Sequence, residues 1–425
     1  MLMFRIVKNV LAFFIPAPVL ISTLSLYHLS LAFLGAILYG FPARQILTIA
    51  VTGTKGKSST TELINAVLEE AGYKTALINS IRIKIGDTSN PNAIGRSMPG
   101  RFYLQRFLSN ALKEGCTAAI LEMTSEGARQ HRHRFIDLDA LVFMNLAPEH
   151  IESHGSYQAY ADAKFSIGRS LANSRKRPRI VVANADDKES NRYLTLPVEH
   201  VLPFSLSAAT PYEAGEREGF FTFDDMRMMV HLPGEFSLKN ALAATTLGSA
   251  LGISTAEIAQ GLQKVTRIPG RAENIDEGQS FLVVVDYAHT PGSLQALIGA
   301  YGTRKKICVL GSAGGGRDTW KRPVMGKLAE SLCEQVILTN DDPYDEEPQQ
   351  IIEDIVHGMT RRPEILLDRR LAIRRALQLA GPGDVVLVTG KGTDPIGGPG
   401  GRKTSWNDVT VAREELQSLL KSGRI

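Results

Sequence analysis

Apolar runs alternate with amphipathic stretches along most of this chain. Four such runs lie in the first half and five in the second: 46–51, 117–121, 140–145, 179–183, 281–286, 305–310, 335–339, 364–367 and 384–388. The first four end in polar or glycine-bearing residues, and helix-like segments separate them. This alternation indicates β-α-β units and a parallel sheet, because parallel neighbours need a crossover helix between them. Two series of runs predict two α/β domains.

The two series are separated by residues 263–274. This segment contains the pair Pro269-Gly270, and a Pro-Gly pair between periodic segments indicates a turn or hinge. We therefore place the first domain at 46–268 and the second at 269–425. The chain has 425 residues, which agrees with an expectation of two to three domains.

Composition narrows the class of protein only a little. Hydrophobic residues make up 44% and charged residues 22%, which excludes a disordered, collagen-like or coiled-coil chain. The net charge of +4 comes from 48 basic and 44 acidic residues, a balance that does not predict nucleic-acid binding and suits an anionic small substrate equally well. Three cysteines, Cys116, Cys308 and Cys333, lie too far apart for a disulfide framework or a paired-cysteine zinc site. We expect buried thiols in a reducing compartment.

The first apolar run leads into a glycine-rich loop, which reads Gly53-Thr54-Lys55-Gly56-Lys57-Ser58-Ser59. A helix-like segment follows it. In this order, backbone N–H groups and the positive end of a helix converge on a phosphate. We expect Lys57 to neutralise the β- and γ-phosphates and Ser58 to offer its hydroxyl to Mg²⁺. The alternative, a glycine turn with an incidental lysine, does not account for the strand–loop–helix order.

Further short blocks follow the loop in an order that one family shares. They are E-M-T-S-E-G at 122–127, Q-H-R at 130–132, N-L at 145–146 with His150 and H-G at 154–155, Y-A-D-A-K at 160–164, N-A-D-D at 184–187, N-A-L-A-A at 240–244, P-G-R at 269–271, D-Y-A-H-T-P at 286–291, K-R-P at 321–323 and G-K-G at 390–392. Together with the loop, these blocks resemble the Mur ligase family, the ATP-dependent amide-forming ligases of peptidoglycan precursor synthesis, and most of all its tripeptide synthetases. The resemblance covers roughly residues 46–415.

The resemblance implies a fold and a reaction. The fold would be a phosphate-loop ATPase domain with a parallel sheet and a Rossmann-like C-terminal α/β domain, preceded by a short hydrophobic helical segment at 1–45. In the reaction, a substrate carboxylate attacks the γ-phosphate of ATP to give an acyl phosphate. An amine then attacks the acyl phosphate through a tetrahedral intermediate and releases phosphate. Because the first step brings two anions together, positioned cations must supply most of the catalysis.

The resemblance also assigns a catalytic and metal-binding set. Lys57, Glu122, His150 and Lys164 would be catalytic, and Ser58 would join the last three around Mg²⁺. Magnesium prefers hard oxygen donors, so the role of His150 rests on the resemblance alone. Lys164 would be carbamylated, which replaces an ammonium by an anion that can approach a magnesium site.

Other residues would bind ATP and the two substrates. ATP would be held by Gly53, Thr54, Lys55, Gly56, Lys57, Ser58 and Ser59, with Asn240 near adenine, Arg271 near the phosphates and Asp286 on the ribose. The muramoyl-peptide acceptor would contact Ser97, Thr124, Gln130 and Arg132, and the amino acid would contact Asp341, Asp342, Tyr344 and Asp394. The basic cluster at 129–134 therefore indicates an acidic acceptor rather than a nucleic acid.

Two positions depart from the family pattern in the amino-acid site. Tyr344 stands where ligases that add meso-diaminopimelate usually carry the arginine of D-N-P-R. Tyrosine cannot make the planar bidentate pair that arginine makes with a carboxylate, so lysine or another amino acid stays open. The family's G-K-G-H-E ends here in Thr393-Asp394, which keeps an acid on a shorter arm.

The N-terminal segment is the largest departure, because residues 9–43 contain no Lys, Arg, Asp or Glu. A signal peptide would fit Arg5 and Lys8 before an apolar run, but export would separate the enzyme from ATP. A membrane span needs about 20 apolar residues, whereas the run at 10–21 is short and contains two prolines. We favour one or two helices on the membrane surface or packed on the first domain, anchored by Tyr27, Tyr39 and Phe41. The resemblance implies a uridine-binding domain before the first strand, and because residues 1–45 are mostly apolar we expect no evident site for the nucleotide end of the acceptor.

We therefore expect an ATP-dependent ligase that adds an amino acid to a muramoyl-peptide carboxylate. It would be a cytoplasmic monomer at the inner face of the membrane, with peripheral contact through residues 9–43 and no nucleic-acid partner. One alternative is a Mur-type ligase for a lipid-linked, folate-like or polyamide acceptor. The other is a catalytically silent, membrane-associated nucleotide-binding module, against which the joint presence of the four catalytic residues argues.

Overall fold

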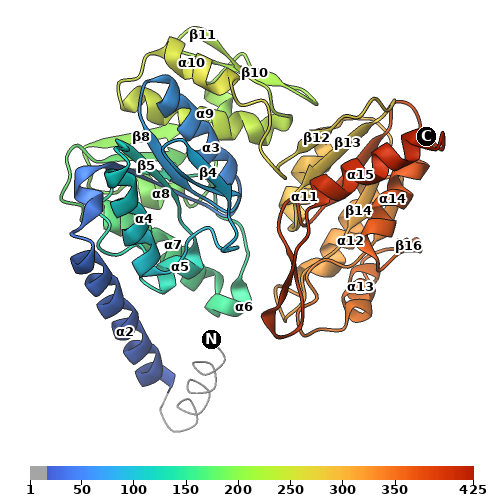
Figure 1. The fold of residues 1–425 in the computed structure, drawn as a ribbon, viewed down its shortest axis with the longest axis horizontal. Helices are drawn as coiled ribbons and strands as arrows, with labels where there is room; N and C mark the ends of the chain where they lie inside the picture. Colours follow the sequence, from blue (N-terminus) through green and yellow to red (C-terminus); the bar gives the residue numbers. More distant parts are fainter. Residues whose placement is uncertain (1–16) are drawn as a thin grey trace.

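The computed structural model describes residues 17–425, which form two α/β domains side by side and an N-terminal helix, α2 (Ala17–Leu38) (Figure 1). Residues 1–16, which include Arg5, Lys8 and the start of the uncharged segment, lie outside the described residues. Most of the residues on which the signal-peptide interpretation rests are among them. Among the helices of residues 17–425, none is both long and apolar enough to cross a membrane.

The first domain is built on an eight-stranded sheet in the order β4-β3-β2-β5-β1-β6-β7-β8. All neighbours from β2 to β8 pair in parallel, while β3 and β4 pair antiparallel at one edge. The strands are β1 (Leu47–Thr52), β2 (Thr75–Ile78), β3 (Arg82–Ile85), β4 (Thr88–Pro91), β5 (Ala118–Glu122), β6 (Ala140–Phe143), β7 (Ile180–Asn184) and β8 (His200–Phe204). The four apolar runs predicted in this part of the chain are β1, β5, β6 and β7, each within two residues at its ends.

Helices cover both faces of this sheet, which is why its central strands are uniformly apolar rather than alternating. One face packs on α3 (Lys57–Glu70), α9 (Gly234–Ala250) and α10 (Thr255–Gln263). The other packs on α4 (Arg101–Lys113), α5 (Ser125–Arg129), α7 (Tyr157–Ala172) and α8 (Ser190–Leu194). Cys116 lies in this second core, as the predicted buried thiol.

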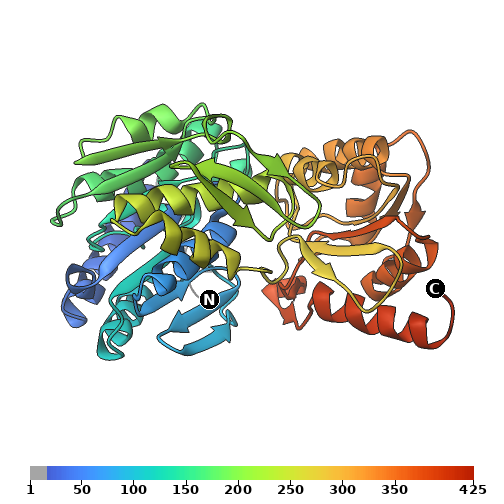
Figure 2. The same cartoon turned by 90° about the horizontal axis from the view of Figure 1, so that it is seen from above.

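The second domain lies beside the first (Figure 2). It has a six-stranded sheet in the order β12-β13-β17-β14-β15-β16. Its strands are β12 (Glu273–Ile275), β13 (Leu282–Asp286), β14 (Lys306–Leu310), β15 (Gln335–Leu338), β16 (Glu364–Ile365) and β17 (Val385–Thr389), and only β12 pairs antiparallel. Its helices are α11 (Pro291–Gly299), α12 (Lys321–Leu332) and α13 (Pro348–Val356) on one face, and α14 (Arg369–Leu379) and α15 (Asp408–Lys421) on the other. All five predicted strands are present.

Smaller elements complete the chain. A three-stranded antiparallel sheet, which the sequence analysis missed, joins the first domain beside α9. It consists of β9 (Glu213–Ala214), β10 (Gly219–Phe223) and β11 (Met226–Val230). The remaining elements are α6 (Ile151–His154), the 3₁₀ turns η1 (Pro42–Gln45), η2 (Leu206–Ala208) and η3 (Pro399–Gly401), and the ribbon of β18 (Ile396–Gly397) with β19 (Lys403–Thr404).

Candidate active site

The glycine-rich loop lies between β1 and α3, in the predicted strand–loop–helix arrangement. Gly53 (φ 150°) and Gly56 (φ 80°) both have backbone angles that favour glycine. A Cβ at Gly53 would approach Met144 Cβ to 2.9 Å, and one at Gly56 would approach Asn240 Oδ1 to 2.4 Å. Both glycines are therefore required by close packing as well as by conformation. The loop presents its backbone N–H groups and the start of α3 in the way that phosphate binding needs.

The polar side chains of the loop reach in different directions. Thr54 Oγ1 lies 2.8 Å from the hydroxyl of Tyr160, and the backbone N–H of Lys55 donates to Asn145 Oδ1 (2.9 Å). Lys57 Nζ folds back onto Thr54 O (2.9 Å). The Lys55 ammonium instead points towards the second domain, since a Cβ at Gly292 would meet its Nζ at 2.5 Å. Ser59 is half-buried on the first turn of α3.

Ser58 and Glu122 form one oxygen-rich cluster. Glu122, the last residue of β5, is 3% exposed and accepts hydrogen bonds from Ser58 Oγ (2.7 Å) and the Ser80 backbone N–H (3.1 Å). Ser80 Oγ also lies 2.8 Å from Ser58 Oγ and accepts from Arg271 Nη2 at 3.0 Å. Carboxylate and hydroxyl oxygens are the donors that Mg²⁺ prefers, so this cluster fits the predicted metal. Within residues 17–425, no three His, Cys, Asp or Glu side chains converge on a shared metal position.

Lys164 is buried on α7, and its Nζ donates to Gly53 O at 2.6 Å. Burial, and then the neighbouring charge of Lys57, lower the pKa of Lys164 well below its ordinary value. A buried lysine with a depressed pKa is neutral at pH values where a free lysine is charged. The structure thus brings Lys164 to the floor of the phosphate loop.

The segment that carries His150 is held by the second domain. Glu149 Oε1 lies 2.9 Å from His289 Nε2, and the Asp318 carboxylate accepts the backbone N–H groups of His150 (2.9 Å) and Ile151 (3.2 Å). Burial alone would raise the pKa of Glu149, but the hydrogen bond from His289 and the nearby cations lower it below its usual range. His150 itself has φ 57°, which an ordinary side chain adopts at a cost. Sequence reasoning gave no role to Glu149, His289 or Asp318, and only their charge and their place after strand ends could have drawn attention to them.

The predicted nucleotide residues lie on both domains. Asn240 is buried on α9 against the phosphate loop, and its Oδ1 accepts from Thr60 Oγ1 (3.3 Å). Asp286 ends β13, where its two carboxylate oxygens accept the N–H groups of Ala272 (2.7 Å) and Ala288 (2.6 Å). Burial raises the pKa of Asp286. Arg271 stacks its guanidinium 4.4 Å above the Tyr287 ring, and with its bond to Ser80 it bridges the two domains.

The predicted acceptor residues gather around α5. Thr124 caps this helix by accepting the Gly127 N–H (3.1 Å). Arg132 Nη2 donates to Gln130 Oε1 (2.7 Å), and its Nη1 donates to Met98 O, the residue after Ser97. The structure therefore brings Ser97, Gln130 and Arg132 into one neighbourhood.

The predicted amino-acid residues lie in the second domain. Lys391 Nζ binds Asp342 Oδ1 (2.7 Å) and lies 3.8 Å from the buried Asp341, so Asp342 is already paired within the protein. Asp394 lies one turn further on, with its N–H donated to Lys391 O (2.9 Å). The Tyr344 ring lies 4.5 Å below the guanidinium of Arg317, which sequence reasoning missed.

Comparison with known proteins agrees with this arrangement. Residues 51–248 match the Mur ligase middle domain, and residues 270–392 match the Mur ligase glutamate ligase domain. The UDP-N-acetylmuramoyl-L-alanyl-D-glutamate–2,6-diaminopimelate ligase of Syntrophomonas wolfei is 33% identical over 408 residues, covering 92% of this chain and 82% of that protein. Its counterpart in Geobacillus thermodenitrificans is 35% identical over 405 residues, covering 91% and 82%.

Solved structures give the same picture. A structure of a UDP-N-acetylmuramoyl-L-alanyl-D-glutamate–2,6-diaminopimelate ligase is 27% identical with a TM-score of 0.59, covering 88% of this chain and 79% of that one. The folylpolyglutamate synthase of Mycobacterium tuberculosis shares the fold, with a TM-score of 0.68 at 14% identity, and covers 92% and 95%. Since the family's models match both domains and relatives above 30% identity span most of its length, the chain belongs to the Mur ligase family.

Proposed function

We propose that this protein is an ATP-dependent ligase that joins an amino acid to the carboxylate of a muramoyl-peptide acceptor in peptidoglycan precursor synthesis. The observation that carries the proposal is the cluster of Ser58, Glu122 and Arg271, because it joins the phosphate loop to the second domain through Ser80. A nucleotide-binding module without catalysis would not need a guanidinium delivered across the domains to the metal-binding end of the loop.

In the first step two anions, the acceptor carboxylate and the γ-phosphate of ATP, must come together, and positive side chains reduce their repulsion. Lys57 lies at the start of α3, where its ammonium can neutralise phosphate oxygens of ATP, and Arg271 supplies a second cation from the connection between the domains. Ser58 and Glu122 would hold Mg²⁺, which supplies Lewis-acid stabilisation of the transferred phosphoryl group when bound. The acceptor carboxylate oxygen forms the new bond to the γ-phosphorus, the bond to ADP breaks, and the acyl phosphate results.

The second step needs an amine beside the activated carbonyl. Its nitrogen bonds to the acyl carbon to give the tetrahedral intermediate. The C–O bond to phosphate then breaks, phosphate leaves, and the nitrogen loses one proton to become the amide. The contacts of His289 with Glu149 and of Asp318 with the backbone at 150–151 hold the domain that binds the amino acid against the domain that binds ATP. These contacts support the proposal, because holding the two domains together would bring the amine close to the acyl phosphate.

We further propose that Lys164 is carbamylated. Its depressed pKa favours the free amine, which can attack CO₂ to form a carbamate and release one proton. The resulting anion would lie among Lys57, Glu122 and His150, whose charges already influence this group or are influenced by it. Lys164→Ala should lose most activity and regain part of it with an added short-chain carboxylate. Full activity of Lys164→Ala without rescue would refute the role.

For the amino acid, we propose that Arg317 rather than residue 344 binds its carboxylate. Tyr344 cannot form the bidentate pair, whereas the Arg317 guanidinium lies over the tyrosine ring at 4.5 Å. The relatives named above add 2,6-diaminopimelate, so this amino acid and lysine are the first candidates. Arg317→Gln should raise the KM for the amino acid at least tenfold and leave the KM for ATP unchanged, because the carboxylate loses its bidentate partner. An unchanged KM for the amino acid would refute the assignment.

The protein's place in the cell follows from the same reaction. We propose a monomer on the cytoplasmic side of the membrane, where ATP is available, with α2 as a peripheral membrane contact. The support is the outer face of α2, where Leu26 is 65% and Leu38 is 68% exposed. Light scattering would test the monomer, and sedimentation with vesicles would test the contact.

The ligase function is tested by phosphate release from ATP and Mg²⁺ with a panel of amino acids and a muramoyl dipeptide. Release that requires both substrates, with the amide product seen by mass spectrometry, is expected. Glu122→Gln should abolish it, whereas Glu414→Gln, a change at an exposed ion pair with Arg370, should not. ATP binding without turnover under every combination would instead support the nucleotide-binding module.

A further inference from the structure

Helix α2 buries its small residues and exposes its large apolar ones. Its inner face consists of small residues, Ala32, Gly35 and Ala36, which are buried and allow close approach to α4. Its outer face carries large apolar side chains, with Leu34 53% and Leu38 68% exposed. A helix on the surface of a water-soluble domain turns its large apolar residues inward instead. The outer face of α2 is therefore built for an apolar neighbour.

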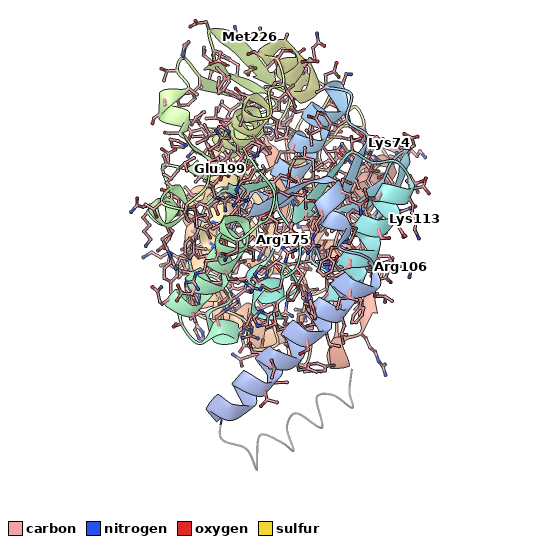
Figure 3. All side chains as sticks on the ribbon, turned by 90° about the vertical axis from the view of Figure 1, so that its left-hand side faces the viewer. Lys74, Arg106, Lys113, Arg175, Glu199 and Met226 are labelled. Atoms are coloured by element: carbon pink, nitrogen blue, oxygen red, sulfur yellow. The ribbon has the colours of Figure 1, made fainter. Side chains whose placement is uncertain are left out.

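The exposed apolar residues form one strip along the helix. They are Leu26, Tyr27, Phe33, Leu34, Ile37 and Leu38, all at least 45% exposed. At 1.5 Å per residue the strip from Leu26 to Leu38 is about 18 Å long. Exposed basic residues lie on the same face of the molecule beyond the C-terminal end of the strip, with Arg106 and Lys113 on α4 and Arg175 beyond α7 (Figure 3). An apolar strip with basic residues near one end fits a helix that lies in the interface of an anionic membrane.

Two polar side chains on the inner side of α2 contact residues close to the predicted acceptor residues. His28 Nδ1 lies 2.7 Å from Arg101 Nη2, and Ser25 Oγ lies 2.7 Å from His131 Nε2. Arg101 also donates to Gln130 O (3.2 Å), and Gln130 binds Arg132. The helix thus contributes side chains to the neighbourhood of the predicted acceptor residues, and one edge of it separates that site from the apolar strip.

Arg101 and Arg132 form a cationic pair that has no counter-ion among residues 17–425. Across the described part of the chain, neither guanidinium makes a salt bridge, and the buried Nε atom of each lacks a hydrogen-bond acceptor. The nearest carboxylate, Glu126, is taken by Arg129 and Gln130. Burial and repulsion from neighbouring arginines lower the pKa of Arg132 to about 10. Two buried donors without partners indicate an anionic ligand.

We propose that the acceptor is a membrane-borne, lipid-linked molecule whose anionic group binds Arg101 and Arg132 while its hydrocarbon chain stays in the bilayer against the outer strip of α2. This inference rests on the proposed function and names its substrate class. The apolar strip is the outer face of α2, and His28 of the same helix contacts Arg101 of α4 at 2.7 Å. A lipid chain along the strip would therefore have its head group within about one helix diameter of the arginines. A soluble, nucleotide-linked acceptor would use the arginines but would leave the strip exposed to water.

The test compares one muramoyl dipeptide in two forms. One form is linked to UDP in solution, and the other is linked to a polyprenyl diphosphate in vesicles of phosphatidylglycerol and phosphatidylcholine. We expect kcat/KM at least tenfold higher for the lipid-linked form. The double variant Leu34→Gln with Leu38→Gln should lose this preference and keep the KM for ATP. Leu371→Gln is the matched control, because Leu371 is 51% exposed on α14, far from the strip.

Vesicle co-sedimentation separates this inference from the proposed function. Wild-type protein should bind vesicles that contain the lipid-linked dipeptide at least tenfold more tightly than vesicles without it. Arg101→Gln should remove that difference while its melting temperature and its KM for ATP stay those of the wild type. Binding without ligation would support the acceptor class and overturn the proposed reaction. Equal use of both acceptors, or equal binding to both kinds of vesicle, would overturn the inference.

Discussion

Replacing Lys164 by methionine is expected to flatten the pH dependence of stability. The side chain is 2% exposed and its Nζ has one hydrogen-bond partner, Gly53 O at 2.6 Å. Burial, and then the charge of Lys57, lower its pKa well below the ordinary value. In the unfolded chain the same amine titrates near pH 10.4, so it carries a proton throughout the neutral range.

The sign and size of the effect follow from proton linkage. Between the folded-state pKa and roughly pH 10, the unfolded chain binds one more proton than the folded chain at this site. The free energy of unfolding of the wild type should therefore rise, relative to Lys164→Met, by about 1.4 kcal/mol for each pH unit in that window. The variant should also be the more stable protein at the acidic end, because it buries no ammonium.

Urea unfolding followed by far-ultraviolet circular dichroism measures this difference. Both proteins are compared at pH 7, 8 and 9 in buffer free of CO₂ and Mg²⁺, so that neither carbamate nor metal contributes. If the free energy of unfolding changed with pH equally in the two proteins, Lys164 would be an ordinary ammonium in the folded protein. That result would remove the physical basis for carbamylation, because the free amine would no longer be favoured.

Further substitutions test other contacts. Asp318→Asn weakens the hydrogen bonds to two backbone N–H groups of the facing domain, which should lower the free energy of domain docking by about 1 kcal/mol. The kcat/KM for the amino acid should then fall roughly fivefold. An unchanged kcat/KM in steady-state kinetics would contradict this expectation. Arg369→Leu leaves the buried Asp408 without its partner and should cost about 3–5 kcal/mol in urea unfolding, most of which the double change with Asp408→Leu should restore. Gly358→Ala would place a Cβ within 1.8 Å of a facing carbonyl oxygen and should destabilise by about 1–3 kcal/mol. Gly299→Ala, which meets nothing within 4 Å, should raise the melting temperature instead, and equal shifts in the two glycine variants would refute the packing argument.

Much of the framework was predictable from spacing alone. The apolar runs fall on the strands of both sheets, because a strand that helices cover on both faces must be apolar at successive positions. The small antiparallel sheet of β9, β10 and β11 was missed, since β9 has only two residues and β10 and β11 are only partly buried. The sequence did not predict which face of α2 packs on the domain, because the segment is apolar on every side. In the structure its small residues point inward and its large ones outward.

The sequence by itself determined the phosphate loop, because Gly53, Gly56 and Lys57 are neighbours whose order and spacing already specify a turn and a helix start. Only the tertiary structure decided which distant groups meet that loop. Glu149 pairs with His289 across 140 positions, and Asp318 caps the backbone at His150 across 168. Local periodicity predicts which face of a segment is buried. It does not predict how two domains dock, because the docking free energy comes from contacts between residues far apart in the chain.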